Sequence, residues 1–393
     1  MGGPQKLKQI LEYKENYNEL NNLLDLVLKD VHSISSKIKK NENIIFTIAN
    51  TAYSEKANRP YRTPIRKTKD SYIFGVIVYS QLQSIIFSCK LDGLVDYIFV
   101  DCEKKLPGLK NPDYSLLDKF RISSHIKNKY KSGLPNQTEF GNISKVCRDV
   151  VKKSQVYSYK ANDITIDATW LFLVDYFHDL SGKTIAIIGG GNIGSKLSLK
   201  LVESAAEVRL VGNVSDLSLN IKSINNIKQD SVLSKVSLFK NKLDAANGVD
   251  AILGCTNLQQ VIDANLVNKM KPSGVIIDVG KGNFTDKGLE KASQLGIRTW
   301  RADIYPIISN MVSTAKEMRY FREEVYGISG RFRDFQVVSG GYIGEKYDII
   351  VDNYKDTKNV LGVCDGKGSM LSELDSVAEK NVTTVKEEIK NKL

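Results

Sequence analysis

Cysteine and histidine are scarce in this chain of 393 residues, and their scarcity excludes several kinds of site. The five cysteines are scattered without C-x-x-C spacing, which argues against a disulfide framework and against a zinc site. The three histidines lie far apart in the sequence, so no histidine-based metal centre is expected. We therefore predict a metal-free protein with reduced thiols, as is usual in the cytoplasm.

Long apolar runs are also missing. No run approaches the roughly 18 residues that span a bilayer, and no signal-peptide core follows the first residues. The net charge of +11 invites a nucleic-acid interpretation, but the lysines are spread along the whole chain and no basic run is interleaved with aromatic residues. We expect neither a membrane nor a nucleic-acid partner. The lysines indicate a solvated surface or a site for anionic substrates.

The N-terminal region carries an apolar heptad pattern. Apolar residues recur there at alternating spacings of three and four: Ile10, Tyr13, Tyr17, Leu20, Leu24, Val27, Val31, Ile34 and Ile38. This spacing predicts a long helix over about residues 4–40. A coiled-coil seam between two chains and a helix packed on its own domain give the same pattern, so both alternatives stay open. A homodimer is expected.

The rest of the chain predicts an α/β fold in two sheets. Apolar runs at 44–49, 72–79 and 97–103 indicate strands, with a helix at 81–93 between two of them. From residue 184 to residue 303, strands and helices alternate as in a doubly wound parallel sheet. The strands are expected at 184–188, 207–212, 236–239, 250–254, 274–279 and 297–301. Residues 335–353 suggest a hairpin, and 369–393 a closing helix.

These patterns predict four segments. They are an N-terminal helix (1–41), an α/β catalytic domain that binds the substrate (42–165), a nucleotide-binding domain (166–310), and a C-terminal segment that returns to the first domain (311–393).

A glycine-rich turn follows the strand at 184–188. Gly189, Gly191 and Gly194 satisfy G-x-G-x-x-G within "IAIIGGGNIGSKL". The first glycine permits a tight turn, the second lets the backbone approach a pyrophosphate, and the third lets helix and strand pack closely. The helix that begins at Asn192 and Ile193 would point its free N–H groups at the phosphates. The turn therefore predicts a dinucleotide site of the Rossmann type.

The end of the second strand bears on which dinucleotide is bound. The acid that grips the adenosine ribose normally stands there, but this chain has Gly212 instead, and Asp216 comes four residues later. Asn213 and Ser215 could donate hydrogen bonds to a 2′-phosphate, although the loop has no arginine. We favour NADP, with NAD as the alternative.

Further cofactor contacts are expected where the fourth and fifth strands end, because carboxyl ends of strands face the ligand in such sheets. Cys255 is interpreted as a small residue that lets the nicotinamide ring approach, with a reactive thiol as the alternative. The expected residues are Cys255, Thr256, Asn257, Gly280 and Lys281, with Asn283 nearby.

The segment 162–213 resembles the domain junction of shikimate dehydrogenases and methylenetetrahydrofolate dehydrogenases, and "GVIIDVGKGNFT" (274–285) is similar in style to the latter. The resemblance lies within residues 162–303 and is at the level of a superfamily of two-domain NAD(P)-dependent oxidoreductases. It implies an N-terminal catalytic domain, a Rossmann-type domain and a substrate held between them.

The resemblance also implies a catalytic lysine and aspartate, which match only approximately. Lys67 follows "RTP" and Asp167 ends "TID". A lysine–carboxylate pair can move the proton that accompanies hydride transfer. The basic segment 59–69 indicates a loop that clamps an anion or is merely solvated, and we expect Arg62, Arg66 and Asn162 to contact the substrate.

The sequence therefore predicts an NAD(P)-dependent oxidoreductase acting on a small anionic carbonyl or alcohol, or imine or amine. The alternative is a protein that binds the dinucleotide without turnover.

Overall fold

The computed structural model describes residues 15–51, 59–106, 113–131 and 142–392. The chain divides into two compact units, Met1–Ser309 and Asn310–Leu393. The first unit contains two α/β sheets and the second contains a small sheet with one helix packed on it. The predicted boundaries at 41/42 and 165/166, and the return of 311–393 to the first domain, stay predictions. No helix in the described ranges is long and apolar enough to cross a membrane.

The first sheet orders its strands β2-β4-β1-β5-β6, and β3 also pairs with β4. Strands β1, β4, β5 and β6 run parallel, whereas β2 and β3 are short antiparallel additions at the edge. The strands are β1 (Asn43–Asn50), β2 (Tyr61–Arg62), β3 (Arg66–Lys67), β4 (Ser71–Val78), β5 (Tyr97–Asp101) and β6 (Gln155–Tyr159). The three strands predicted from apolar runs are thus confirmed within two residues at each end.

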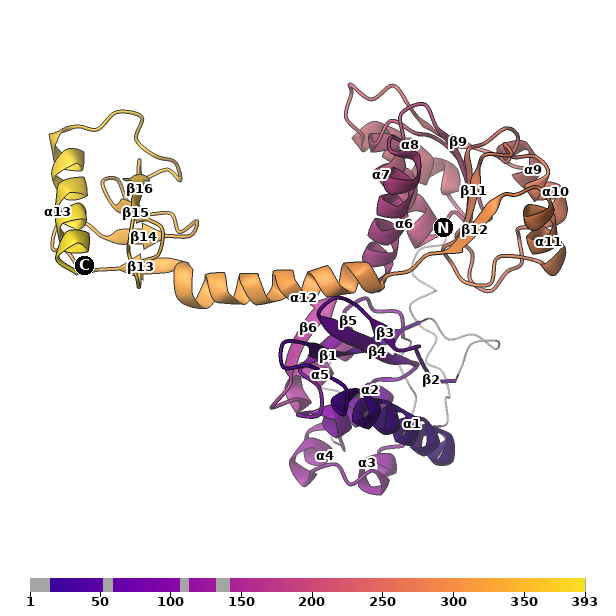
Figure 1. The fold of residues 1–393 in the computed structure, drawn as a ribbon, viewed down its shortest axis with the longest axis horizontal. Coiled ribbons are helices and arrows are strands. Elements are labelled where there is room, and N and C mark those ends of the chain that lie inside the picture. The colour runs from indigo at the N-terminus through magenta and orange to yellow at the C-terminus, as the bar shows by residue number, and fades with distance from the viewer. Residues whose placement is uncertain (1–14, 52–58, 107–112, 132–141, 393) are drawn as a thin grey trace. The chain divides into compact units, whose positions relative to one another are not determined.

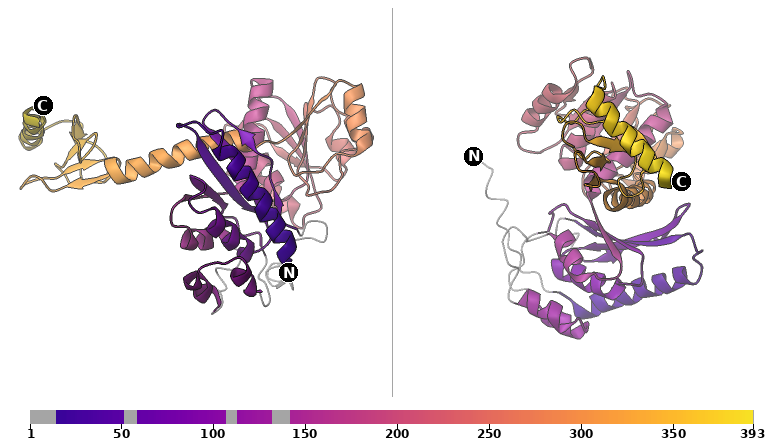
Figure 2. Two further views of the ribbon diagram at one scale, coloured as in Figure 1. Left: turned by 60° about the horizontal axis from the view of Figure 1, so that its bottom comes forward. Right: turned by 90° about the vertical axis from the view of Figure 1, so that its left-hand side faces the viewer.

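Helices α1 (Tyr17–Ser35) and α2 (Gln81–Leu91) pack into one core with this sheet, together with the shorter α3 (Ser115–Lys119), α4 (Ser124–Lys131) and α5 (Ile143–Val150). Figures 1 and 2 show α1 running along the sheet. The heptad positions Leu20, Leu24, Val27, Val31 and Ile34 are all buried within this core. The helix therefore packs on its own domain, and these positions are not an open coiled-coil seam. Ile10 and Tyr13 lie outside the described residues.

The predicted helix over 4–40 ends earlier than expected. Beyond Ser35 the chain folds into tight turns, in which the N–H groups of Lys37 and Ile38 both bond the carbonyl of Ile34. These turns redirect the chain so that β1 can enter the middle of the sheet.

Replacing Leu24 with alanine tests this packing. Leu24 is 4% exposed, whereas Leu26 on the same helix is 43% exposed. We expect Leu24→Ala to lower the free energy of unfolding by about 2–5 kcal/mol because it leaves a cavity. Leu26→Ala, the matched control, should change it by less than about 0.5 kcal/mol. Denaturant unfolding measures both, and equal losses would contradict the packing described.

The second sheet orders its strands β12-β11-β10-β7-β8-β9, all parallel. Two halves therefore wind outward from β7 and β10, which is the doubly wound Rossmann order. The strands are β7 (Thr184–Ile188), β8 (Glu207–Val211), β9 (Val236–Leu238), β10 (Ala251–Gly254), β11 (Val275–Asp278) and β12 (Arg298–Arg301). The predicted α/β fold with a doubly wound nucleotide-type sheet is confirmed, and each predicted strand lies within one residue of an observed one.

Helices cover both faces of this sheet, with separate apolar cores on either side. They are α6 (Ala161–Phe177), α7 (Asn192–Glu203), α8 (Leu217–Ile227), α9 (Lys242–Ala245), α10 (Ala264–Val267) and α11 (Asp286–Gln294). Helix α6 joins the two sheets of the first unit. It begins at Ala161, so Asn162 lies in its first turn.

The segment after β12 contacts the first sheet. The hydroxyl of Tyr305 donates to the carbonyl of Pro64 at 3.1 Å, and the hydroxyl of Ser309 donates to that of Thr68 at 3.3 Å. Both residues belong to helix α12 (Tyr305–Tyr320), which continues into the second unit.

The second unit packs helix α13 (Ser376–Lys392) on the sheet β13-β14-β15-β16 (Figure 1). Its strands are β13 (Gly327–Ser329), β14 (Val337–Ser339), β15 (Ile349–Val351) and β16 (Val360–Val363), and α12 runs into the π-turn η3 (Phe321–Val325). The predicted hairpin over 335–353 is wrong, because β14 and β15 pair in parallel. Gly340 and Gly341, both with positive φ, help the connection cross over, and the antiparallel partner of β15 is β16.

Candidate active site

The glycine turn between β7 and α7 has the three spatial properties that a dinucleotide cradle needs. Gly189 has a φ of +123°, and a Cβ there would lie 2.7 Å from the Cys255 carbonyl carbon. A Cβ on Gly194 would lie 1.9 Å from the Gly189 oxygen, so only glycine lets α7 approach the turn. A Cβ on Gly191 would meet nothing within 4 Å. The turn is therefore tight where the chain packs and open where a pyrophosphate would lie.

Helix α7 begins directly behind this open position. Gly191 is its N-cap, and Asn192 and Ile193 are its first residues. The first N–H groups of a helix have no partner within the helix and carry its positive dipole end. Asn192 and Ile193 thus present anion-binding groups beside Gly191, which fits a phosphate-bearing cofactor.

The end of β8 explains why the expected ribose acid is missing. A Cβ on Gly212 would lie 2.6 Å from the backbone nitrogen of Gly190, so an aspartate at that position would displace the glycine turn. The following Asn213 and Ser215 are exposed, and Asp216 has a φ of +66° immediately before α8. The polar groups at this end of β8 are therefore the neutral side chains of Asn213 and Ser215 and the carboxylate of Asp216.

The loops after β10 and β11 are tied to each other. Asn283 is fully buried; its amide donates to the Thr256 carbonyl and to Asp278, and it accepts from the Thr256 hydroxyl. A Cβ on Gly280 would lie 2.0 Å from the Thr256 oxygen, so the two loops touch at that point. Cys255 and Thr256 are thus held beside the glycine turn, whereas Asn257 is exposed. Burial raises the pKa of the Cys255 thiol to about 12, which favours the small-residue interpretation over a reactive thiolate.

Lys281 connects this loop to the first sheet. It has a φ of +75°, an uncommon conformation for a lysine. Its ammonium donates to the hydroxyl of Tyr61 at 3.0 Å and lies 4.4 Å from the centroid of that ring. The predicted cofactor-side lysine therefore reaches β2 of the first sheet.

Lys67 and Asp167 do not pair with each other. Lys67 donates to Glu42 at 2.7 Å and to Tyr72 at 3.0 Å, and its side chain is 47% exposed. Asp167 lies on α6 and pairs with Lys200 of α7. The hydrogen bond from Lys67 to Glu42 raises the pKa of the lysine, which is the wrong direction for a catalytic base. The lysine–carboxylate pair expected from these two residues is therefore not formed.

Arg62 and Arg66 of the basic segment have separate partners. Arg62 pairs with Asp30 of α1 at 2.5 Å, and Arg66 lies 3.9 Å from Asp303 with its guanidinium 5.6 Å from the centroid of the Tyr305 ring. Arg62 is paired with α1, whereas Arg66 of β3 is half exposed beside Asp303, which follows β12.

Asn162 lies where the two sheets of the first unit meet. Its side-chain amide donates to the side-chain oxygen of Asn192 at 3.0 Å, beside Gly191. Its backbone N–H donates to Glu103 at 2.9 Å, just beyond the end of β5. This one residue therefore connects the glycine turn to the carboxyl end of the first sheet.

A lysine–carboxylate cluster does exist at this point, with different members. Asp101, the last residue of β5, is completely buried, and Lys105 is 19% exposed. The Lys105 ammonium lies 2.9 Å from Asp101 and 2.9 Å from Glu103. Burial raises the pKa of Asp101, while Lys105 and the backbone N–H groups of Glu103 and Ala161 act in the opposite direction. The cluster holds one fully buried carboxylate and a partly exposed carboxylate and ammonium at the carboxyl end of the first sheet, beside Asn162.

The sequence contained a signal for this cluster. Asp101, Glu103 and Lys105 follow directly on the predicted strand at 97–103, and ends of parallel strands are where ligands bind.

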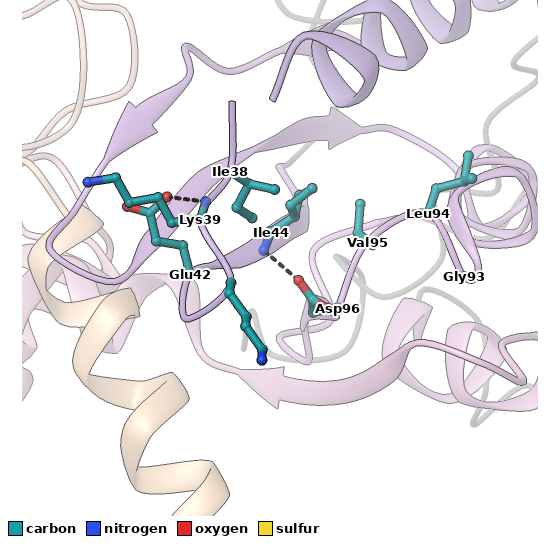
Figure 3. A pocket seen from close by; sticks show the side chains of 9 residues that line it. Ile38, Lys39, Glu42, Ile44, Gly93, Leu94, Val95 and Asp96 are labelled. Atoms are coloured by element: carbon teal, nitrogen blue, oxygen red, sulfur yellow. Dashed lines mark hydrogen bonds between the residues drawn. The ribbon is translucent and has the colours of Figure 1, made fainter. Parts of the chain in front are cut away.

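Two hollows in the first unit lie at the opposite, amino ends of the strands. One, of about 340 Å³, is lined by Lys39, Glu42, Ile44 and Asp96, and the Ile44 N–H donates to Asp96 across it (Figure 3). The other, of about 710 Å³, lies by Lys183, Asp250 and Arg298, where β7, β10 and β12 begin. Neither hollow includes the glycine turn or the Asp101 cluster.

No family model matches the chain. Two glycerol-3-phosphate dehydrogenases [NAD(P)+] of Streptococcus agalactiae, from serotypes V and III, are 28% and 30% identical to it over 109 residues. The match covers 26% of this chain and 32% of theirs, so the chain spans about a third of the length of these curated relatives.

Solved structures give broader but weaker likenesses. Shikimate 5-dehydrogenase of Listeria monocytogenes, solved with shikimate and NAD, has 15% identity and a TM-score of 0.35, covering 68% of this chain and 89% of that one. L-Tryptophan dehydrogenase of Nostoc punctiforme has 11% identity and a TM-score of 0.37, covering 71% and 75%. The Rossmann-type fold that the resemblance implies is confirmed by the strand order of the second sheet.

Proposed function

We propose that the chain is an NAD(P)-dependent oxidoreductase that transfers a hydride to or from a small anionic substrate, a carbonyl or alcohol or an imine or amine. The observation that carries the proposal is the hydrogen bond between Asn162 and Asn192. Because the backbone N–H of Asn162 also bonds Glu103, this contact supports a site in which the lysine–carboxylate cluster adjoins a glycine turn whose open position fits a pyrophosphate.

A bound nicotinamide cofactor would supply or accept the hydride. The backbone of Gly189–Gly194 would hold its pyrophosphate, with Cys255, Thr256 and Gly280 near the nicotinamide half. Taking a hydride from an alcohol or amine carbon leaves a proton on oxygen or nitrogen that must be accepted, and the reverse reaction needs that proton supplied. Lys105 and Asp101 are the groups we propose for this proton, in place of Lys67 and Asp167.

Arg66 and Lys281 are proposed to attract the anionic part of the substrate. Each of them contacts a residue in or next to the other sheet. Arg66 of the first sheet lies by Asp303, which follows β12, and Lys281, which follows β11, lies by Tyr61 of the first sheet. Arginine binds carboxylate and phosphate groups through two parallel hydrogen bonds, which suits a small anion. A homodimer also stays part of the proposal, without the buried heptad positions as its interface.

NADP is the proposed cofactor, because Gly212 cannot be replaced by an acid without displacing Gly190. We expect Asn213→Asp to reverse the preference from NADPH to NADH, since a carboxylate repels the 2′-phosphate and accepts from the ribose hydroxyls. One charged hydrogen bond changes affinity by about tenfold or more. Fluorescence titration of both cofactors measures the change.

Asn226→Asp is the control for this substitution. It adds the same charge at the far end of α8, about 14 Å along the helix at about 1.5 Å per residue. It should leave the ratio of affinities unchanged. A wild-type protein that prefers NADH, or an Asn213→Asp variant that keeps the wild-type ratio, would contradict the NADP assignment.

Oxidation of NADPH, followed by absorbance over a panel of small 2-oxo acids and imino acids, tests the activity itself. We expect binding of NADPH and its oxidation by at least one member of the panel. Binding without oxidation would favour the alternative of a dinucleotide-binding protein, and no binding of either cofactor would overturn both.

A further inference from the structure

The side-chain oxygen of Asn50 is a buried acceptor with no hydrogen-bond partner among the described residues. Asn50 is the last residue of β1, the strand between β4 and β5, and it is 3% exposed. A buried carbonyl without a donor is costly, so native structures normally supply one from protein, water or ligand. The only other such side-chain atom in the described ranges is the Ser88 hydroxyl, on a helix away from the strand ends.

The orientation of the Asn50 amide is fixed by its other half. Its nitrogen donates to the backbone carbonyl of Glu103 at 2.9 Å. A carbonyl oxygen can only accept, so the nitrogen must face Glu103 and the oxygen must point elsewhere. Exchanging the two atoms would bring two oxygens together, which excludes the flipped amide.

The unpaired oxygen of Asn50 lies at the same carboxyl end of the first sheet as the proposed proton-transfer cluster. Asn50 touches Glu103, and Glu103 in turn bonds Lys105 and the backbone of Asn162. Within this group, Asp101 and Glu103 are acceptors, whereas Lys105 is the one cation and is already shared between them. The carboxyl end of the first sheet therefore has more hydrogen-bond acceptors than donors among these side chains.

We propose that Asn50 Oδ1 accepts a hydrogen bond from a hydroxyl or ammonium group of the substrate. This inference rests on the proposed function and specifies its substrate: the reduced form, an alcohol or amine, donates to Asn50, whereas a carbonyl cannot. Asn50 is thus a specificity-determining residue that favours a substrate form with an O–H or N–H donor over a carbonyl.

Three compounds with the same carboxylate test the proposal: L-lactate with a hydroxyl, L-alanine with an ammonium, and pyruvate with a carbonyl. Each is titrated into the ¹⁵N-labelled full chain, and the side-chain amide signal of Asn50 is followed by NMR. The Asn50→Ala variant identifies that signal by its loss, and backbone assignment identifies it if the variant does not fold. The amide of the fully paired Asn283 is the internal control.

We expect lactate or alanine to shift the Asn50 signal saturably, at least about tenfold more tightly than pyruvate, as one hydrogen bond predicts. Which of the two shifts it distinguishes a hydroxyl from an ammonium source. An equal shift with pyruvate, or no shift with any of the three, would overturn the proposal. NADPH titration distinguishes failure of this inference from failure of the proposed function. If NADPH binds but no donor-specific shift occurs, only the inference about Asn50 is overturned. If a donor-specific shift occurs but NADPH does not bind, the proposed function is overturned and the Asn50 contact stands.

Discussion

Gly191→Asp should weaken NADPH binding by at least about 100-fold without lowering the thermal midpoint of unfolding. The new carboxylate would stand at the open position of the turn, where two like charges about 4 Å apart repel by about 4 kcal/mol at a surface-like dielectric. The fold should tolerate it, because a Cβ there meets nothing within 4 Å and φ is −74°. Aspartate is also a favourable N-cap. Fluorescence titration and thermal unfolding measure the two quantities.

Gly330→Asp provides the matched control for this experiment. Gly330 is exposed, and a Cβ added to it would also meet nothing within 4 Å, but it lies in the second unit. It should keep the wild-type affinity for NADPH. Unchanged affinity in Gly191→Asp would mean that no pyrophosphate lies at this turn.

Lys105→Met should reduce turnover by about 10²–10⁴-fold, the usual contribution of a positioned proton donor or acceptor. It removes the ammonium that compensates the fully buried Asp101, so stability should fall as well, by about 3–5 kcal/mol for a broken buried pair. The affinity for NADPH should stay within about twofold because the glycine turn is untouched. Steady-state kinetics, denaturant unfolding and cofactor titration measure the three effects.

Lys67→Met is the control for this variant, since it makes the same chemical change elsewhere in the domain of the first sheet. Lys67 is 47% exposed and its ion pair with Glu42 is a surface pair, so its loss should change stability and turnover little. Turnover that is lost in Lys67→Met and kept in Lys105→Met would reverse the assignment of the proton-transfer lysine.

Local patterns were sufficient to predict the second sheet. Its strands are short apolar runs bounded by glycine and polar turns, and the glycine roles at 189, 191 and 194 follow from spacing alone because the contacts are local. The sequence could not predict that the heptad residues are buried in their own domain. The same apolar helix face can pack against a second chain or against a sheet of the same chain. The structure decides between them through the burial of Leu24 and its neighbours.

Sequence patterns do not show which side chains pair when they are distant in the sequence. The resemblance implies a catalytic role for Lys67 and Asp167, yet Lys67 pairs with Glu42 and Asp167 pairs with Lys200, because the packing of other elements brings these partners near. The hairpin at 335–353 failed for a related reason, because apolar runs mark strands but not their direction. The Asp101–Lys105 pair, four residues apart in one loop, was accessible to sequence reasoning from the strand end alone.

A crystal structure of the complex with NADPH tests the central claim most directly. The account predicts the pyrophosphate against the backbone of residues 190–193, with the nicotinamide half on the side of Thr256, Gly280 and Asn162. A cofactor bound elsewhere, for example in the hollow by Lys183 and Arg298 at the amino ends of the strands, would contradict it.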